Sequence, residues 1–241
     1  MTQSRFFTDF DRFTGMMKSG VPFALGRFAD GEVALMQGRS IGPETQAGMV
    51  DRWTAPDRMT LVGQTLLHCL DMCDENYYCA ISAPTDSLTD YLYLHNRIKR
   101  VDNITFANLW INANYTRMLD FYQSVEGAYV ICNHRANRDA FPFHVRGLFP
   151  VPDDIVNWVE AKGIVIDEFW DFRIRGEGHT IFVAAGPLSA IIVYMLHRLC
   201  PGNQYVDVGS SMDEFIHGRK TRPYMNPGSH YAHEISKLPP E

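Results

Sequence analysis

The segment Asp30-Gly31-Glu32 holds the two residues of this chain with the clearest capacity for chemistry. The carboxylates lie two positions apart, where an apolar stretch ending at Phe28 meets a helical pattern. Two carboxylates, completed by water and phosphate oxygens, suit Mg²⁺ or Mn²⁺, and the cation would neutralise charge on a leaving diphosphate. The alternative is local, because Asp30 can cap the helix while Glu32 favours its first turn.

Two later segments and one earlier residue could bind an anion such as a diphosphate. Gly186-Pro187 begins a helix after an apolar stretch, and the N–H groups of a helix N-terminus favour anions, although a tight turn would need the same residues. Arg135 could grip a phosphate through its planar guanidinium, or belong to a solvated loop. Arg27 could contact phosphate or pair with Asp30.

The C-terminal stretch contains a compact positive loop in an otherwise acidic protein. Arg219, Lys220 and Arg222 could hold the diphosphate of a donor or an anionic acceptor, or form a solvated surface. His230 and His233 lie one helical turn apart, which is compatible with a shared metal ion but is also common without one.

Apolar stretches alternate with helical periodicity along nearly the whole chain. The predicted strands are 22–28, 78–82, 103–107, 128–132, 164–166, 180–185 and 204–208. The predicted helices are 6–17, 30–37, 56–73, 86–99, 113–124, 152–163 and 187–199. This alternation predicts an α/β fold with a Rossmann-like, mostly parallel sheet, helices on both faces and a single domain over 1–241.

Ligands of such sheets bind at the carboxyl ends of the strands. We therefore expect Asp30, Asn133, Gly186 and Gly209, each of which follows a predicted strand, to lie along one edge of the sheet. The motifs GxGxxG and GxxxxGK[ST] are absent, which disfavours NAD enzymes and P-loop enzymes.

Composition limits the functional classes further. The net charge of −6 argues against a nucleic-acid binder. No apolar run is long enough to span a bilayer, and residues 1–10 lack the apolar core of a signal peptide. The five cysteines form no CxxC pair, so we expect reduced thiols in a cytoplasmic protein. Oligomerisation is left open.

Three segments resemble the motifs of the GT-D type bacterial glycosyltransferases, in the same order. Residues 23–32, FALGRFADGE, followed by GRSI at 38–41, are similar to the family's first motif. Residues 183–187, VAAGP, and 205–209, YVDVG, resemble two later ones, and the closing histidines loosely match its end. Ala29 replaces a usual glycine, and Ser210-Ser211-Met212 replaces a usual H-I-D.

The resemblance implies a metal-dependent glycosyltransferase, a hexosyl- or pentosyltransferase acting in glycan or polysaccharide assembly. It implies a nucleotide-sugar donor, with a UDP-sugar the first expectation, a glycan or polysaccharide acceptor, and Asp30-x-Glu32 as the metal or donor motif. Asp207 and Gly209 fall in the last matching segment and are expected to contact the donor.

A catalytic base is expected among the acids that follow the last strand, because an acceptor hydroxyl has a pKa far above neutrality. Glu214 is the first candidate, since it matches an acidic position of the family, and Asp213 is the second. The competing functions are another Rossmann-like transferase, such as a methyltransferase, and a non-catalytic module that binds nucleotides or carbohydrates.

Overall fold

The computed structural model describes residues 4–40, 60–71, 75–162 and 176–239. The strand expected at 164–166 and the beginning of the helix expected at 56–73 lie outside these ranges. None of the helices in the described part of the chain combines the length and apolar character needed to cross a membrane.

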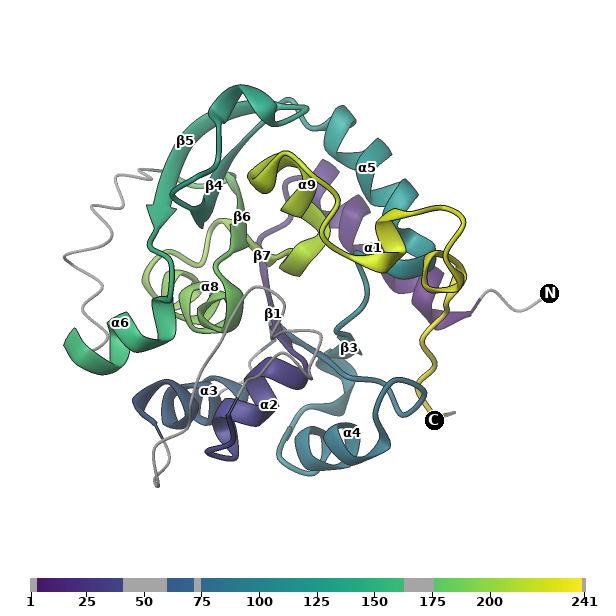
Figure 1. Cartoon of the computed structure of the whole chain (residues 1–241), viewed down its shortest axis with the longest axis vertical. Helices are drawn as coiled ribbons and strands as arrows, with labels where there is room; N and C mark the ends of the chain where they lie inside the picture. The colour runs from purple at the N-terminus through teal and green to yellow at the C-terminus, as the bar shows by residue number, and fades with distance from the viewer. Residues whose placement is uncertain (1–3, 41–59, 72–74, 163–175, 240–241) are drawn as a thin grey trace.

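A parallel sheet forms the centre of the molecule and confirms the predicted α/β class (Figure 1). Within the described ranges it has seven strands in the order β3-β2-β1-β7-β6-β4-β5, and every pairing is parallel. The strands are β1 (Phe23–Phe28), β2 (Tyr77–Ile81), β3 (Ile104–Phe106), β4 (Gly127–Asn133), β5 (His144–Val151), β6 (Thr180–Ala184) and β7 (Gln204–Asp207).

Helices cover both faces of the sheet because successive strand residues point to opposite sides. In β1, Ala24 packs in one apolar cluster, whereas Phe23 and Leu25 pack in the other. The first cluster includes residues of α2 (Asp30–Met36), α3 (Leu61–Asp71), α4 (Leu88–His95), α6 (Ile155–Lys162) and α8 (Ser189–Leu199). The second includes residues of α1 (Arg5–Lys18), α5 (Tyr115–Ser124) and α9 (Asp213–His217).

Short 3₁₀ turns connect several of these elements. They are η2 (Val101–Asn103), η3 (Asn112–Asn114), η4 (Arg138–Ala140), η5 (Gly186–Leu188), η6 (Gly209–Met212), η7 (Pro223–Met225) and η8 (His230–His233).

The neighbouring strands β1 and β7 send the chain to opposite faces of the sheet. After β1 the chain enters α2 on one face, and after β7 it passes through η6 into α9 on the other. A crevice forms outside the carboxyl ends of strands at such a switch in direction. The fold therefore places the loops that follow β1, β6 and β7 around one opening.

The strand β5 was not predicted from the sequence. It is an edge strand, paired only with β4 within the described residues, and its residues alternate irregularly between buried and exposed positions. Gly147 and Pro150 lie within it, and proline is tolerated in a sheet where its missing N–H faces no partner strand. An edge strand does not need the continuous apolar sequence that identifies the buried strands.

Candidate functional site

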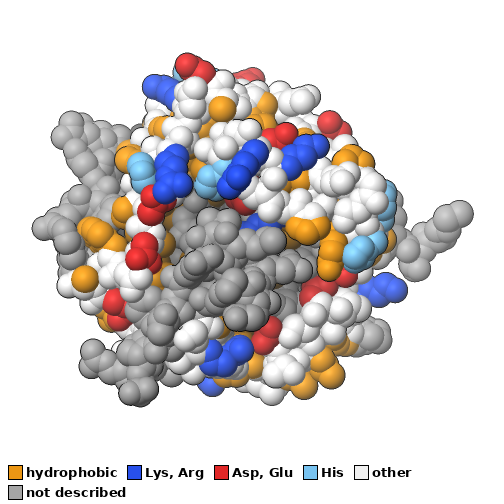
Figure 2. All heavy atoms as spheres, viewed as in Figure 1, with side chains coloured by type: hydrophobic (Ala, Val, Ile, Leu, Met, Phe, Trp, Pro, Cys, Tyr) orange, Lys and Arg blue, Asp and Glu red, His pale blue; other side chains and the backbone are white. Residues whose placement is uncertain are grey.

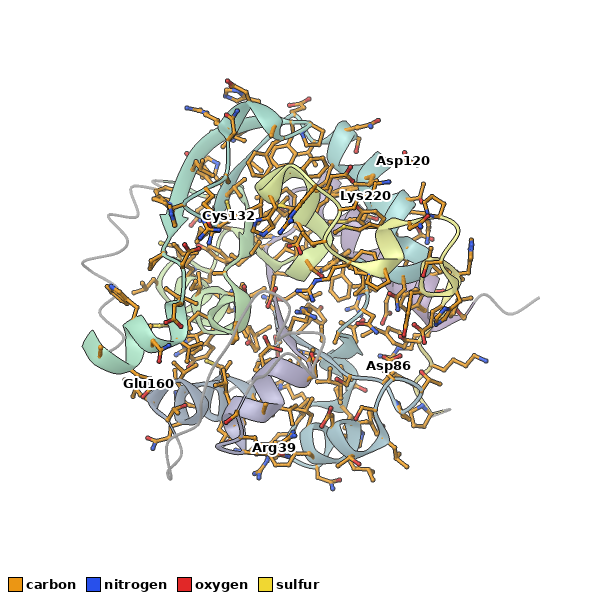
Figure 3. All side chains as sticks on the ribbon, viewed as in Figure 1. Arg39, Asp86, Asp120, Cys132, Glu160 and Lys220 are labelled. Atoms are coloured by element: carbon orange, nitrogen blue, oxygen red, sulfur yellow. The ribbon has the colours of Figure 1, made fainter. Side chains whose placement is uncertain are left out.

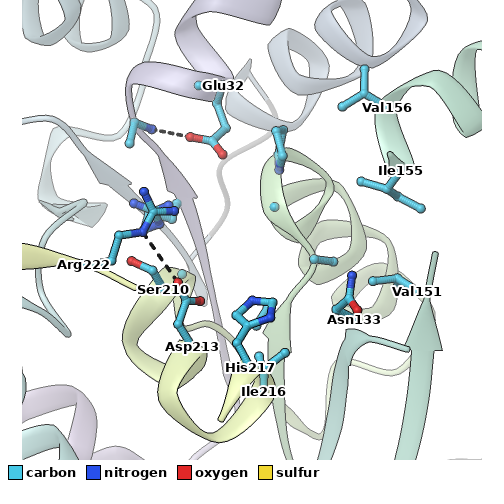
Figure 4. Close-up of a pocket in the computed structure, with 18 of the residues that line it drawn as sticks. Glu32, Asn133, Val151, Ile155, Val156, Ser210, Asp213, Ile216, His217 and Arg222 are labelled. Atoms are coloured by element: carbon cyan, nitrogen blue, oxygen red, sulfur yellow. Dashed lines mark hydrogen bonds and ion pairs between the residues drawn. The ribbon is translucent and has the colours of Figure 1, made fainter. Parts of the chain in front are cut away.

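A cleft of about 480 Å³ opens at the carboxyl edge of the sheet. It is lined by the segments that follow β1, β4, β5, β6 and β7, together with residues of α9 and η7 (Figure 4). Asp30, Asn133, Gly186 and Gly209 all line it, which confirms their predicted placement along one edge. The volume is in the range of sites for small molecules and cofactors.

The first turn of α2 forms one wall of the cleft. Glu32 is buried, and its Oε2 accepts a hydrogen bond from the backbone N–H of Ala29 at 2.8 Å. Figure 4 shows this carboxylate at the entrance of α2, directed toward the open space of the cleft. Asp30 is exposed and makes no hydrogen bond within the described residues. The N-cap of α2 is therefore Ala29 and not Asp30 as expected, and Glu32 completes the cap through its hydrogen bond with Ala29.

Arg27, near the end of β1, lies among three carboxylates on this side of the cleft. Its side chain, 21% exposed, has Nε 4.0 Å from Oδ1 of Asp207, and it also interacts electrostatically with Glu32 and Asp30. Gly209 allows this arrangement, because a Cβ added there would lie 2.7 Å from Nε of Arg27. One guanidinium among three carboxylates leaves an excess of negative charge when all the acids are ionised.

Asp207 lies behind the cleft rather than on its surface. Its carboxylate accepts hydrogen bonds from the backbone N–H groups of Arg27, at 3.2 Å, and Gly209, at 3.0 Å. Burial raises the pKa of Asp207 to about 7; the charge of Arg27 opposes this rise and that of Glu32 adds to it. Burial raises the pKa of Glu32 as well, against the effect of Arg27 and the hydrogen bond from Ala29.

The opposite wall is built from α9 and the segment that follows it. Asp213 is buried, and its Oδ2 accepts a hydrogen bond from the Thr221 hydroxyl at 2.5 Å and lies 3.5 Å from Nε of Arg222. Tyr224 donates a hydrogen bond to the Ser210 hydroxyl at 2.8 Å. These contacts hold Arg222 and Tyr224, both of which line the cleft, against η6 and α9.

One face of α9 points into the cleft. Asp213, Ile216 and His217 line it, and their spacing of three and four residues places them on the same side of a helix. Glu214 is turned about 100° from Asp213 by the helical period of 3.6 residues per turn. Glu214 instead accepts a hydrogen bond from the Tyr115 hydroxyl of α5 at 3.3 Å.

The third side of the cleft combines ion pairs and an apolar surface. Arg135 forms an ion pair with Asp153, whose carboxylate also accepts a hydrogen bond from the Asn133 amide at 2.8 Å. The hydrogen bond from Asn133 lowers the pKa of Asp153, and the hydrogen bond and positive charge of Arg135 lower it further. Val151 and Ile155 add apolar lining on this side (Figure 4).

The structure brings most of the predicted donor-binding residues into the cleft. Those that line it are Arg27, Asp30, Gly31, Glu32, Arg135, Gly186, Pro187, Gly209 and Arg222, together with the second base candidate, Asp213. Their grouping follows from their position at the ends of parallel strands or on the segment that packs over those ends.

Six predicted residues do not line the cleft, for identifiable reasons. Glu214 faces α5, and Asp207 is covered by Arg27 and Gly209. Arg219 and Lys220 are exposed on the turn after α9, where Figure 3 labels Lys220. Figure 2 shows Lys, Arg and His side chains grouped on this part of the surface.

The two C-terminal histidines lie apart from the carboxylates of α2. His233 interacts through Nε2 with the Pro227 carbonyl at 3.0 Å, and the ring of His230 lies tilted against that of Tyr231, with centroids 3.9 Å apart. Neither lines the cleft. In the described ranges, no three His, Cys, Asp or Glu side chains gather closely enough to form a metal site by themselves.

Sequence reasoning left His217, Ser210 and Tyr224 out of the site, although all three line the cleft. The spacing of Asp213 and His217 along one short helix is the signal that could have identified His217. No such signal exists for Tyr224, because its position depends on packing against Tyr115, with ring centroids 5.1 Å apart.

No protein-family model matches the chain, and no curated protein matches its sequence. Solved structures do match. One, described as showing that "the highly conserved domain of unknown function 1792 has a distinct glycosyltransferase fold", is 13% identical, with a TM-score of 0.51 over 98% of this chain and 95% of that one. Another, "a new glycosyltransferase (DUF1792) from Streptococcus sanguinis", is 14% identical, with a TM-score of 0.53 over 96% of this chain and 93% of that one. The chain therefore has this glycosyltransferase fold, which confirms the fold that the GT-D resemblance implied.

Proposed function

We propose that this protein is a glycosyltransferase that moves a sugar from a nucleotide-sugar donor to a hydroxyl of a glycan or polysaccharide acceptor. The observation that carries the proposal is the cleft at the β1–β7 switch, where carboxylates and arginines face one another in a glycosyltransferase fold. A UDP-sugar is the first donor class to test. The proposal places the reaction in the cytoplasm.

The donor diphosphate is assigned to the space between Arg27, Arg222 and the first turn of α2. Two guanidinium groups enter this space from different walls, and each can donate two parallel hydrogen bonds to phosphate oxygens. Both are held by carboxylates, Arg27 by Asp207 and Arg222 by Asp213, so little side-chain freedom is lost when phosphate binds.

A divalent cation, Mn²⁺ or Mg²⁺, is assigned to Asp30 and Glu32. The residues fit such an ion, because both supply oxygen ligands, Asp30 makes no hydrogen bond within the described residues, and the carboxylates around Arg27 outnumber its positive charge. When bound, the ion supplies charge stabilisation for the departing diphosphate. Arg27 and Arg222 orient the diphosphate and share this role.

The proposal is tested by measuring binding and turnover of UDP-, GDP- and dTDP-sugars with and without Mn²⁺. We expect one sugar nucleotide to raise the melting temperature more with Mn²⁺ than without it, and to release its nucleoside diphosphate during incubation. Stabilisation by S-adenosylmethionine instead, with no effect of any sugar nucleotide, would contradict the proposal and favour a methyltransferase.

A further inference from the structure

The ionisable side chains of the cleft differ in whether they already have hydrogen-bond or ion-pair partners in the protein. Asp213 is engaged by Thr221 and Arg222, and Asp153 by Asn133 and Arg135. In the same way, Asp154 accepts two hydrogen bonds from Asn157, and Glu32 accepts one from Ala29. Each of these carboxylates already has a partner in the protein, so a new partner would have to compete with an existing contact.

Two proton acceptors of the cleft make no hydrogen bond within the described part of the chain. They are Asp30, on the wall formed by α2, and His217, on the wall formed by α9. Asp30 lies beside Arg27 and Glu32, where the proposed function places the diphosphate. His217 is half-buried at the last position of α9, and its imidazole can take a partner without breaking an existing bond.

The two walls face each other across the cleft. Figure 4 shows Glu32 at one side of the open space and the His217 ring entering it from the other, with Asp213 beside His217 on the α9 wall and Arg222 paired with Asp213. In a single displacement at the anomeric carbon, the attacking oxygen approaches opposite the bond to the leaving diphosphate. A base for that oxygen must therefore lie across from the leaving diphosphate, and His217 lies opposite Glu32 and the first turn of α2 (Figure 4).

We propose that His217 is the catalytic base of the transfer, an inference that rests on the proposed function. A ring nitrogen of His217 accepts the proton of the acceptor hydroxyl. The hydroxyl oxygen forms the new bond to the anomeric carbon, and the bond from that carbon to the phosphate oxygen breaks. Its electron pair leaves with the nucleoside diphosphate. Histidine is the side chain most often used in general acid–base catalysis, and its ordinary pKa lies near neutral pH.

Asp213, the carboxylate on the same helical face, is then a positioning residue. It fixes Arg222 and Thr221, whereas His217, one turn further along α9, remains open to the cleft. The two titratable residues on this face of the five-residue helix therefore have separate roles: Asp213 holds Arg222 and Thr221, and His217 faces the cleft.

The test compares His217→Gln and His217→Ala with the wild type, using the sugar nucleotide that the wild type turns over in the UDP-, GDP- and dTDP-sugar panel with Mn²⁺. Release of nucleoside diphosphate is measured with water as the accepting hydroxyl. We expect kcat to fall by about 10²–10⁴-fold while the Kd of the nucleoside diphosphate changes by no more than about twofold. Added imidazole should restore part of the rate of His217→Ala, because it can occupy the space of the missing ring.

His144→Gln is the matched control, since His144 is exposed on the edge strand β5 and does not line the cleft. It should keep the wild-type rate. A wild-type kcat in His217→Gln, loss of nucleoside diphosphate binding, or failure of imidazole to restore activity would each overturn the role of His217 alone. A wild-type protein that binds and turns over no member of the panel would overturn the proposed function together with this inference.

Discussion

The two charged walls of the cleft are built in different ways. On the α2 wall, Arg27, Asp30 and Glu32 come from six consecutive positions and are placed by one strand end and one helical turn. On the α9 wall, Asp213, His217 and Arg222 come from a longer segment, which is held in place by side-chain pairs with Thr221, Ser210 and α5. Local geometry thus fixes the first wall, and tertiary contacts fix the second.

Apart from the His217 variants, the largest effect is expected from Asp30→Asn on the α2 wall. Asn keeps the size of the side chain, and the exposed position makes unfolding an improbable cause of any loss. Removing this charge should lower turnover of the sugar nucleotide by about 10²–10³-fold, as expected for a group that stabilises charge on the leaving diphosphate. The stabilising effect of Mn²⁺ on donor binding should disappear as well. Steady-state kinetics over a range of Mn²⁺ concentrations measures both.

Glu214→Gln is the matched carboxylate change on the α9 wall. Because Glu214 contacts Tyr115 rather than the cleft, we expect kcat within about threefold of wild type and a loss of about 1 kcal/mol in the free energy of unfolding. If Glu214→Gln abolished turnover while Asp30→Asn left it intact, the assignment of the two walls would be reversed.

The difference between the walls also separates what the sequence predicted from what it did not. The Asp30-Gly31-Glu32 segment was placed correctly because a strand end and a helix start fix its direction within a few residues. On the α9 wall, the sequence identified the acids but not which of them faces the cleft. The rotation of α9 about its axis decides that: Ile216 is buried against the core, and Glu214 is directed toward Tyr115.

The same distinction applies to the fold. Continuous apolar sequence predicted β6, whose middle residues are buried on both faces, whereas the irregular edge strand β5 gave no such pattern. The helix predicted at 86–99 begins only at Leu88, and Ser87 rather than Asp86 caps it. Asp86 accepts hydrogen bonds from Ser236, 150 positions away, and no local pattern contains that partner.

A third prediction tests Asp207, the buried acid behind the α2 wall. The pKa of Asp207 is raised from 3.8 to about 7, so the folded protein binds a proton there that the unfolded chain releases between these values. The stability that this proton contributes is fully present below about pH 4 and is lost as the pH rises through about 7. Asp207→Asn should remove this loss, which amounts to at most about 1.4 kcal/mol per pH unit.

Urea unfolding of both proteins at about pH 5 and about pH 8 measures the effect as a difference in pH dependence. The difference is the relevant quantity, since burial also raises the pKa of Asp9 and Asp86 and both proteins share these groups. Parallel pH profiles for wild type and Asp207→Asn would show that Asp207 is already ionised in the folded protein at acidic pH.

The last prediction distinguishes the arginine of the α9 wall from its neighbours on the turn. Arg222 lines the cleft with its side chain 15% exposed, whereas Arg219 and Lys220 are exposed and line no part of it. Arg222→Gln should raise the KM for the sugar nucleotide about tenfold, as expected for one lost charge-assisted contact with phosphate.

The double change Arg219→Gln with Lys220→Gln should alter KM by less than about twofold, because exposed charges are screened by solvent and salt. Arg222→Lys is the control that keeps the charge but loses the planar geometry, so it should fall between these two. KM is measured at low ionic strength. If Arg222→Gln and the double change raised KM equally, the turn would attract the donor by its overall charge, and the contact of Arg222 with Asp213 would give it no special role.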